Sequence, residues 1–359
     1  MLGGVLVMRK VTMREIAREL KVSINTVSLV LNNRTGVGEE MRRKVLRTAE
    51  QMGYLEQNDK YNTTYSKKNI CVLLKKIYFN DMHFYSKVLY GIESEANRLG
   101  YDVLVNFIDE TDEVPNCIKL KKVCGVIILG SVPEEKVKKI KNYHIPELPI
   151  VFVDHTSYEE AFDSVLTDNR IGVYKAVDYL MENGFEKIGF FGDLDYSQSI
   201  KERYWGYIEA IRRIPELRDI KKSFDYAAKY SVTIDVEQFV LDKNTEAIIN
   251  KIKTVRELPE AFVCSNDRAA ILLSSALQTM GYKVPKDISV IGFDDMDIGT
   301  MVIPRLTTMH VKMKGMGMRA LNVLIWRLSN RNAPAEKILM PVELVIRDSV
   351  SSKDKRKIN

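Results

Sequence analysis

Residues 12–32 read TMREIARELKVSINTVSLVLN, and this stretch predicts two short helices joined by a tight turn. Thr12 is a good N-cap for the first helix, and Glu15, three residues later, completes the pattern of a capping box. Ser23 is a good N-cap for the second helix. Apolar residues recur on both segments at helical spacing, so each helix has one face to bury. These inward-facing residues are Ile16, Ala17, Leu20, Val27, Val30 and Leu31.

A third helix is predicted over residues 39–52, because two helices this short cannot bury their apolar faces alone. Its sequence, EEMRRKVLRTAEQM, again places apolar residues on one side, and Gly53 follows where a left-handed C-cap belongs. Three helices with a polar, hydroxyl-rich second helix are typical of a helix-turn-helix DNA-binding domain. An ordinary three-helix bundle with a solvated basic face is the alternative.

The charge distribution favours the DNA-binding interpretation. Residues 1–68 contain 13 Lys and Arg against 7 Asp and Glu, a net charge of +6. The whole chain of 359 residues has 54 against 48, also +6, so the remaining residues carry 41 of each sign. A basic head on a neutral body suits electrostatic attraction to the phosphates of a nucleic acid.

The remaining composition argues against several classes of protein. The chain is 45% hydrophobic and 28% charged, which is ordinary for globular proteins, and it is long enough for two or three domains. Its four cysteines form no CxxC pair and its four histidines lack metal-ligand spacing, so we expect no metal site and no cofactor. No apolar run approaches the roughly 20 residues of a transmembrane helix, and the N-terminus does not resemble a signal peptide. We therefore expect a cytoplasmic protein.

The chain divides into a head, a linker, a body and a tail. Residues 8–55 hold the helical head, and residues 56–68, EQNDKYNTTYSKK, are polar and read as a linker. Residues 69–350 form the body, and residues 351–359 form a charged tail that we expect to be disordered. In the body, strands are predicted at 70–74, 101–107, 125–129, 150–153, 188–191, 261–264 and 289–293, helices at 84–99, 133–141, 169–183, 204–213, 245–255, 267–280 and 312–328, and an extended segment at 339–346.

This alternation of short apolar strands and amphipathic helices predicts parallel sheets covered on both faces. The units are too many for one comfortable sheet, so we predict an α/β body of two doubly wound parallel-sheet lobes. Ligands of such sheets bind beyond the carboxyl ends of the strands. Polar residues just past strand ends are therefore site candidates, although Asp and Asn there are at least as often helix caps and turn formers. The candidates are Asp154, Asn266, Asp267, Asp294 and Asp295.

The motifs of the chain, taken in order, resemble those of the lactose-repressor/purine-repressor family of bacterial transcription regulators. The head carries VTMREIARELKVSINTVSLVLNN and EEMRRKVLRTAEQMGY, and the body carries RYWGYIEAI, VCSNDRAA, MGYKVPKDISVIGFDD and PRLTTMH. The resemblance covers residues 8–350 and implies a body like the periplasmic binding proteins. It also implies a dimeric regulator, most often a repressor, whose two heads bind adjacent operator half-sites and whose body binds a small effector.

For the head, the resemblance implies that residues of the second helix contact DNA. The linker lacks the leucine with which the family wedges the minor groove, and Tyr61 is the residue that we expect in its place. Positions that match base-edge contacts in the major groove are Ile24, Asn25 and Leu29, and positions that match phosphate contacts are Ser23, Thr26, Ser28 and Asn32.

For the body, the resemblance implies an effector cleft. Arg203 matches an arginine that reaches the ligand from the second lobe, and Asp294 matches an acid that pairs with this arginine. A charged pair beside aromatic faces suits a polyhydroxylated ligand, so we expect a sugar, with a purine or another corepressing metabolite as the alternative. The other residues that match the cleft are His83, Phe84, Asp154 and Asn266.

Two other function classes fit the sequence less well. A solute-binding protein of the same body fold conflicts with the basic head. A sugar-metabolising enzyme conflicts with the lack of GxGxxG after a strand, of GxxxxGK[ST] and of a nucleophile elbow. Asp294, Asp295 and Asp297 fit a solvated loop better than a set of metal ligands. We therefore predict a regulator rather than an enzyme.

Overall fold

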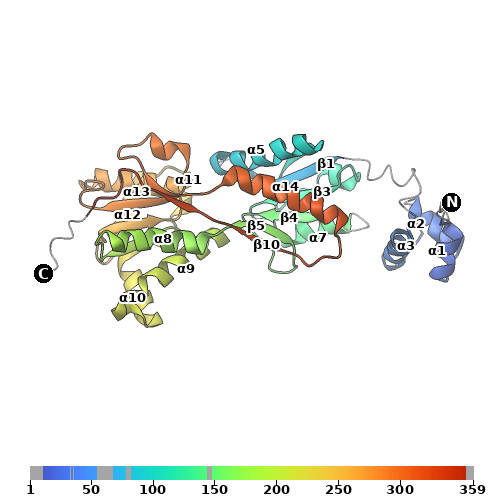
Figure 1. The fold of residues 1–359 in the computed structure, drawn as a ribbon, viewed down its shortest axis with the longest axis horizontal. Helices are drawn as coiled ribbons and strands as arrows, with labels where there is room; N and C mark the ends of the chain where they lie inside the picture. The colour runs from blue at the N-terminus through green and yellow to red at the C-terminus, as the bar shows by residue number, and fades with distance from the viewer. Residues whose placement is uncertain are drawn as a thin grey trace, which may run out of the picture.

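The computed structural model describes residues 11–32, 34, 36–54, 68–77, 82–143 and 148–352. Figure 1 shows a small helical head near the N-terminus and a longer body of two lobes. Tyr61, the predicted linker up to residue 67 and the tail from residue 353 lie outside the described residues. Within these same ranges, none of the helices combines the length and the apolar character that a membrane span requires.

The described part of the head contains the three predicted helices. At the capping box, the Thr12 N–H donates to Glu15 Oε2 (2.8 Å) and the Glu15 N–H donates to Thr12 Oγ1 (3.4 Å). Ser23 Oγ accepts from the Thr26 N–H (2.9 Å). Gly53 has a φ of +73°, the left-handed conformation of a C-cap. The apolar faces meet in one small core. The helices are α1 (Met13–Glu19), α2 (Ile24–Leu31) and α3 (Glu39–Gln51).

The first lobe is a parallel sheet with the strand order β10-β5-β4-β3-β1-β2. Alternate residues of its strand β1 enter two separate cores. Ile70, Val72 and Leu74 belong to the core that contains α5 and α14, and Cys71 and Leu73 belong to the core that contains α6 and α7. The elements of this lobe are β1 (Asn69–Lys75), α5 (Met82–Leu99), β2 (Asp102–Ile108), α6 (Asn116–Lys119), β3 (Gly125–Leu129), α7 (Glu134–Asn142), β4 (Ile150–Val153), β5 (Asp163–Thr167), α14 (Met313–Ser329) and β10 (Lys337–Met340).

The second lobe has the strand order β11-β9-β8-β7-β6, in which β11 is antiparallel and the other strands are parallel. Its strands β6 and β7, with the sequences IGFF and AFVC, are buried and apolar throughout because helices cover both faces. The elements are α8 (Asn169–Glu182), β6 (Ile188–Phe191), α9 (Gln198–Ile211), η2 (Pro215–Leu217), α10 (Ile220–Tyr230), α11 (Glu237–Leu241), α12 (Thr245–Lys253), β7 (Ala261–Cys264), α13 (Asp267–Thr279), β8 (Ser289–Asp294), η3 (Asp297–Thr300), β9 (Thr307–His310) and β11 (Glu343–Val345).

Three segments of the described chain connect the two lobes. β5 of the first lobe leads into α8 of the second, β9 leads back into α14, and β10 leads into β11. Figure 1 shows the last of these segments as an extended red strand that runs from one lobe to the other. Because each lobe is built from two separate stretches of the chain, any rotation of one lobe against the other must be absorbed at these segments.

Helices α5 and α14 of the first lobe pack closely against each other. A Cβ on Gly317 of α14 would lie 2.0 Å from the Val88 carbonyl oxygen of α5, and a Cβ on Gly91 of α5 would lie 2.1 Å from the Lys314 carbonyl oxygen. Only glycine at both positions permits this backbone approach. The tight contact therefore holds the middle of α5 against α14.

The structure differs from the prediction mainly where polar residues are buried. β5 and β9 were not predicted, and their sequences DSVLT and TTMH contain polar residues that are buried in the sheets. The region between residues 213 and 245, where no element was predicted, contains α10 and α11. The single extended segment predicted at 339–346 is divided between β10 and β11, which belong to different sheets.

Candidate functional site

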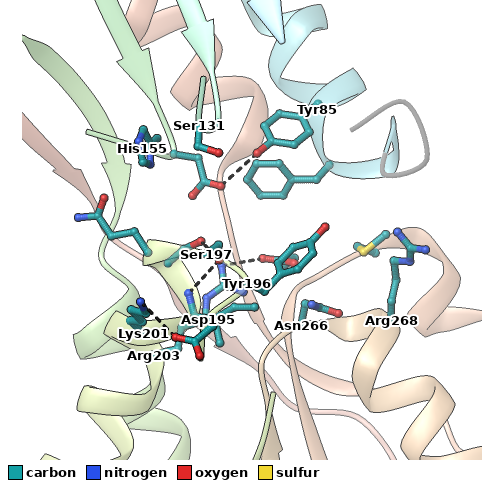
Figure 2. A pocket seen from close by; sticks show the side chains of 18 of the residues that line it. Tyr85, Ser131, His155, Asp195, Tyr196, Ser197, Lys201, Arg203, Asn266 and Arg268 are labelled. Carbon is teal, nitrogen blue, oxygen red and sulfur yellow. Dashed lines mark hydrogen bonds and ion pairs between the residues drawn. The ribbon is translucent and has the colours of Figure 1, made fainter. Parts of the chain in front are cut away.

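A cavity of about 260 Å³ lies between the two lobes, beyond the carboxyl ends of their strands (Figure 2). The first lobe contributes the start of α5 and the loops after β3 and β4. The second lobe contributes residues 195–203, the start of α13 and the end of β8. His83 is exposed at the start of α5 and does not line this cavity, so the structure does not bring it together with the other predicted effector residues. The other predicted effector residues, Phe84, Asp154, Arg203, Asn266 and Asp294, all line it.

Two aromatic rings and a carboxylate form the wall of the first lobe. Phe84 and Tyr85 are buried and pack edge to face, with ring centroids 5.2 Å apart. The Tyr85 hydroxyl donates to Asp154 Oδ2 (3.5 Å), as Figure 2 shows. Asp154 follows β4 with a φ of +60°, a left-handed backbone conformation that is uncommon for residues other than glycine. This wall offers apolar ring surface beside a charged acceptor, which suits a ligand with an apolar face and polar edges.

Arg203 of α9 joins three parts of the second lobe beneath the cavity. Its side chain is only 6% exposed. Nε donates to Asn169 Oδ1 (2.8 Å), Nη2 donates to Asp294 Oδ1 (3.2 Å), and Nη1 donates to the Ser265 carbonyl oxygen. The guanidinium carbon lies 3.8 Å from the centre of the Phe293 ring. Arg203 is therefore an anchor of the lobe as well as part of the cavity wall.

The loop after β8 has left-handed backbone at two successive aspartates. The φ angles are +110° at Asp294 and +59° at Asp295. Asp294 contacts Arg203 and lines the cavity, whereas Asp295 Oδ1 accepts from Arg347 Nη2 (2.5 Å) and Asp295 Oδ2 lies 2.9 Å from His310 Nδ1. Left-handed backbone costs about 1–2 kcal/mol in residues other than glycine and persists where surrounding contacts hold it. The charged partners of both aspartates supply such contacts.

Asn266 has two roles at the start of α13. Its Oδ1 accepts from the Ala269 N–H (2.9 Å) and caps the helix, and its Nδ2 donates to Glu237 Oε2 (3.1 Å). Glu237 is buried, and this burial raises the pKa of its carboxyl. Asn266 is therefore both a helix cap and a residue of the cavity wall, the two alternatives that its place after a strand suggests.

Asp267 and Asp295, the other strand-end candidates, do not line the cavity; the first is buried and the second is half-buried. Asp267 is fully buried, and it accepts from the Thr308 hydroxyl (2.5 Å) and from the Met296 N–H (2.6 Å). Burial raises the pKa of the Asp267 carboxyl to about 7, against the opposing effect of these hydrogen bonds. Within the described ranges, no group of three or more His, Cys, Asp or Glu side chains is placed to hold a metal ion.

The structure adds a polar rim that the sequence analysis missed, because α9 begins at Gln198 rather than near residue 204. Ser197 Oγ caps the helix by accepting from the Ile200 N–H (3.3 Å), so a Ser N-cap was the available signal. Gln198 Oε1 is buried and has no hydrogen-bond partner among the described residues. Lys201 lies 3.5 Å from Asp195 across the same rim. Further lining residues outside the prediction include Tyr85, Ser131, His155, Tyr158, Tyr196 and Arg268.

The second helix of the head presents a mixed surface. Ile24 is 46% exposed and Asn25 is also exposed, so both side chains are accessible. Ser28 and Leu29 are half-buried. Asn32 Nδ2 donates to the Ser28 carbonyl oxygen (2.8 Å), so this amide hydrogen-bonds to a carbonyl group in the last turn of its own helix. The accessible pair at the start of α2 is the part of this helix best placed to reach a partner.

Comparisons with known proteins match both parts of the chain. A family model described as "Bacterial regulatory proteins, lacI family" matches residues 12–57, and one described as "Periplasmic binding protein-like domain" matches residues 177–350. The chain is 28% identical over 348 residues to the HTH-type transcriptional repressor PurR of Mannheimia succiniciproducens, covering 94% of this chain and 98% of the relative.

Solved structures share the fold at low sequence identity. The transcriptional regulator CelR–cellobiose complex has a TM-score of 0.66 at 18% identity, covering 95% of this chain and 100% of that chain. The lac repressor dimer bound to operator and the anti-inducer ONPF has a TM-score of 0.62 at 22% identity, covering 96% and 100%. These similarities confirm the predicted combination of a helical head with a two-lobed body.

Proposed function

We propose, on the premise that the chain belongs to the LacI family of bacterial regulatory proteins, that it is a transcription repressor controlled by a small ligand. The observation that carries the proposal is the presence of two sites in one chain: a helix-turn-helix head and a cavity between two lobes. A DNA-binding head alone needs no such cavity, and a solute-binding protein needs no such head. Control of operator binding by a ligand uses both.

The DNA-binding part of the proposal places α2 in the major groove. A short half-site is all that one head can read, so a homodimer would present two heads to a near-palindromic operator. Tyr61 is proposed as a minor-groove contact from the linker. We assign base-edge contacts to Ile24, Asn25 and Leu29, and phosphate contacts to Ser23, Thr26, Ser28 and Asn32.

A monosaccharide-sized sugar is the ligand that the cavity supports best. Its volume of about 260 Å³ lies below the range of roughly 300–1,000 Å³ that is typical for drug-sized ligands. Arg203 and Asp294 on one side and Asp154 on the other can read hydroxyl groups, because charged groups make strong, directional hydrogen bonds to them. The rings of Phe84 and Tyr85 suit the apolar face of a sugar.

A purine is the second candidate, and a different observation favours it. The relative that is 28% identical over nearly the whole chain is named as a PurR repressor. The aromatic pair Phe84–Tyr85 would then stack on the base, and the cavity's carboxylates would accept from its N–H groups. Such a ligand would act as a corepressor that strengthens operator binding.

The ligand would act by favouring one arrangement of the lobes over another. Lys87 of α5 and Asp297 of η3 form an ion pair (2.9 Å) from opposite lobes. A ligand that contacts both walls stabilises the closed arrangement, and the connecting segments carry that change through the body. Operator affinity changes only if the two arrangements differ in how they hold the heads.

A thermal-shift screen on the full chain tests the ligand class. Pentoses, hexoses, disaccharides and purine bases would be compared, because a ligand at 100 times its Kd adds about 2.7 kcal/mol to the free energy of unfolding. We expect a monosaccharide to raise the Tm most. A purine that raises the Tm while sugars do not would select the second candidate.

A DNA-binding experiment tests the regulator itself. Operator sequences would be selected from a random duplex pool on the immobilised full chain and measured by fluorescence anisotropy at fixed salt, since salt sets the non-specific background. We expect a near-palindrome bound at least about 10³-fold more tightly than random DNA. Binding that never exceeds the non-specific level would overturn the proposal, and turnover of a sugar would instead support the enzyme alternative.

A further inference from the structure

Two cysteine thiols from different elements of the first lobe lie in contact. Cys71 Sγ of β1 and Cys117 Sγ of α6 are 3.8 Å apart. Cys71 is completely buried, whereas Cys117 is half-buried and thus open to small reagents. A disulfide requires about 2.05 Å between the sulfur atoms, so the two thiols need to approach by roughly 1.7 Å. The other two cysteines, Cys124 and Cys264, are buried.

One amide serves both sulfur atoms. Asn106 Nδ2 of β2 donates to Cys71 Sγ (3.5 Å) and to Cys117 Sγ (3.7 Å). Such a donor favours the thiolate over the thiol. The hydrogen bond with the Cys71 thiol lowers the pKa of Cys117 to about 7, and the same contact together with burial raises the pKa of Cys71. Cys117 is thus the accessible, more acidic sulfur, and Cys71 is the protonated partner behind it.

The pair lies where the body begins. Cys71 is two residues after Asn69, the first residue of β1, which follows the predicted linker to the head. The Asn69 Nδ2 donates to the Lys122 carbonyl oxygen (3.1 Å), and the Cys124 thiol donates to the Asn69 carbonyl oxygen (3.3 Å). The segment that carries Cys117 therefore packs against Asn69, where the body begins after the predicted linker. α6 itself is four residues long, so a small shift disturbs little regular structure.

We propose that Cys71 and Cys117 are a redox-sensitive dithiol that hydroperoxides convert into a disulfide, and that this disulfide changes operator affinity. In the first step the Cys117 thiolate attacks hydrogen peroxide, the O–O bond breaks, and a sulfenic acid forms while hydroxide leaves and is protonated to water. In the second step the Cys71 sulfur attacks the Cys117 sulfur, the S–O bond breaks, and the leaving hydroxide takes the Cys71 proton and departs as a second water. Two thiols and one peroxide thus give one disulfide and two waters.

The first test counts thiols in the full chain before and after hydrogen peroxide. We expect wild type to lose two of its four thiols and two hydrogen atoms of mass, with a peptide map that joins residues 71 and 117, and to recover both thiols in dithiothreitol. Cys124→Ala is the matched control and should still form the disulfide. Cys117→Ser should form none, and Cys71→Ala should stop at the Cys117 sulfenic acid, which dimedone traps. Four surviving thiols, or a disulfide between other cysteines, would overturn the proposal.

The second test compares operator affinity of the reduced and oxidised protein. This part rests on the proposed function. We expect at least a threefold change in Kd in wild type and in Cys124→Ala, and none in Cys117→Ser. If the disulfide forms and the Kd is the same, the regulatory part fails and the dithiol stands. If neither form binds DNA specifically, the proposed function fails, and the thiol count still decides the chemistry.

Discussion

Replacing Arg203 by methionine should destabilise the second lobe strongly. The side chain is 6% exposed and donates to Asn169, Ser265 and Asp294, so the substitution removes a charge and three hydrogen bonds at once. Methionine keeps much of the aliphatic volume, so a large cavity is not the cause of any loss. What remains is a buried carboxylate at Asp294 that has lost its guanidinium.

The magnitude follows from this burial. Removing one partner of a buried ion pair costs about 3–5 kcal/mol. In proteins of 150–250 residues, each kcal/mol shifts the Tm by roughly 2–4 °C, so we expect a fall of about 6–20 °C for Arg203→Met, towards the low end for this longer chain. Arg203→Lys keeps the charge but loses the planar fork, so it should cost less than Arg203→Met.

Differential scanning calorimetry of the full chain measures this, with Arg213→Met as the matched control. Arg213 also pairs with a carboxylate, that of Asp178, but its side chain is 52% exposed. Exposed pairs contribute about 0–1 kcal/mol, so the control should lower the Tm by no more than about 4 °C. Equal Tm values for wild type and Arg203→Met would refute the anchor assigned to Arg203.

The same residue tests the cavity. In folded Arg203→Lys, the sugar that gives the largest thermal shift should bind roughly 10–100-fold more weakly, because hydrogen bonds to charged groups contribute about 1.5–3 kcal/mol. Operator affinity without ligand should stay near that of wild type, since the head is a separate module. An unchanged sugar affinity by calorimetric titration would leave Arg203 as an anchor only.

Four further predictions concern the head, the cleft mouth, the buried acid and the loop after β8. Asn25→Ala should cost roughly 1–3 kcal/mol of specific operator binding and leave non-specific binding unchanged; equal losses in both by anisotropy would make Asn25 a phosphate contact. Lys87→Glu should weaken ligand binding roughly two- to fivefold, and adding Asp297→Lys should restore it, with both effects shrinking at high salt; a double variant no better than the single one would exclude the pair. The raised pKa of Asp267 means that the folded state keeps a proton that the unfolded state releases. The contribution of this protonated carboxyl to the free energy of unfolding is therefore lost as pH rises through about 7. Denaturation at pH 5 and pH 7 should show wild type losing roughly 2–3 kcal/mol more than Asp267→Asn over this interval, and parallel profiles would contradict it. Arg347→Lys should reduce the ligand's effect on operator Kd while leaving ligand affinity nearly normal, and equal changes in both would count against coupling through this residue.

The strand–helix alternation of the body could be predicted because its central strands are continuous apolar runs. β5 could not, since its sequence DSVLT includes Asp163 and Thr167, which are buried. Burial is possible at Asp163 because Arg327 of α14 donates to both of its carboxylate oxygens (2.7 and 2.6 Å). The two residues are 164 positions apart, and a local hydropathy pattern contains no information about a partner so distant.

The strand-end rule located the cavity but could not separate neighbouring candidates. Asp294 lines the cavity, and Asp295 does not; Asn266 lines it, and Asp267 does not. Each pair is adjacent in sequence and similar in chemistry, so composition and spacing treat its members alike. Their directions depend on backbone φ, which at Asp294 and Asp295 is held by contacts with Arg203 and Arg347. The sequence indicates the edge of the sheet, and tertiary contacts decide which acid faces the ligand.

The contacts of Asp295 can pass a movement caused by the ligand to the segments that connect the lobes. Because Asp295 directly follows Asp294, a ligand that displaces Asp294 must also move Asp295 or strain the peptide between them. The Asp295 carboxylate contacts His310, the last residue of β9 before the crossing to α14, and Arg347, which lies two residues after β11. A carboxylate–guanidinium contact is directional, so it transmits position as well as attraction. In Arg347→Lys the charge attraction to Asp295 would remain, but the directional contact of the guanidinium would be lost. We therefore expect this variant to weaken the coupling between ligand and operator more than it weakens ligand binding.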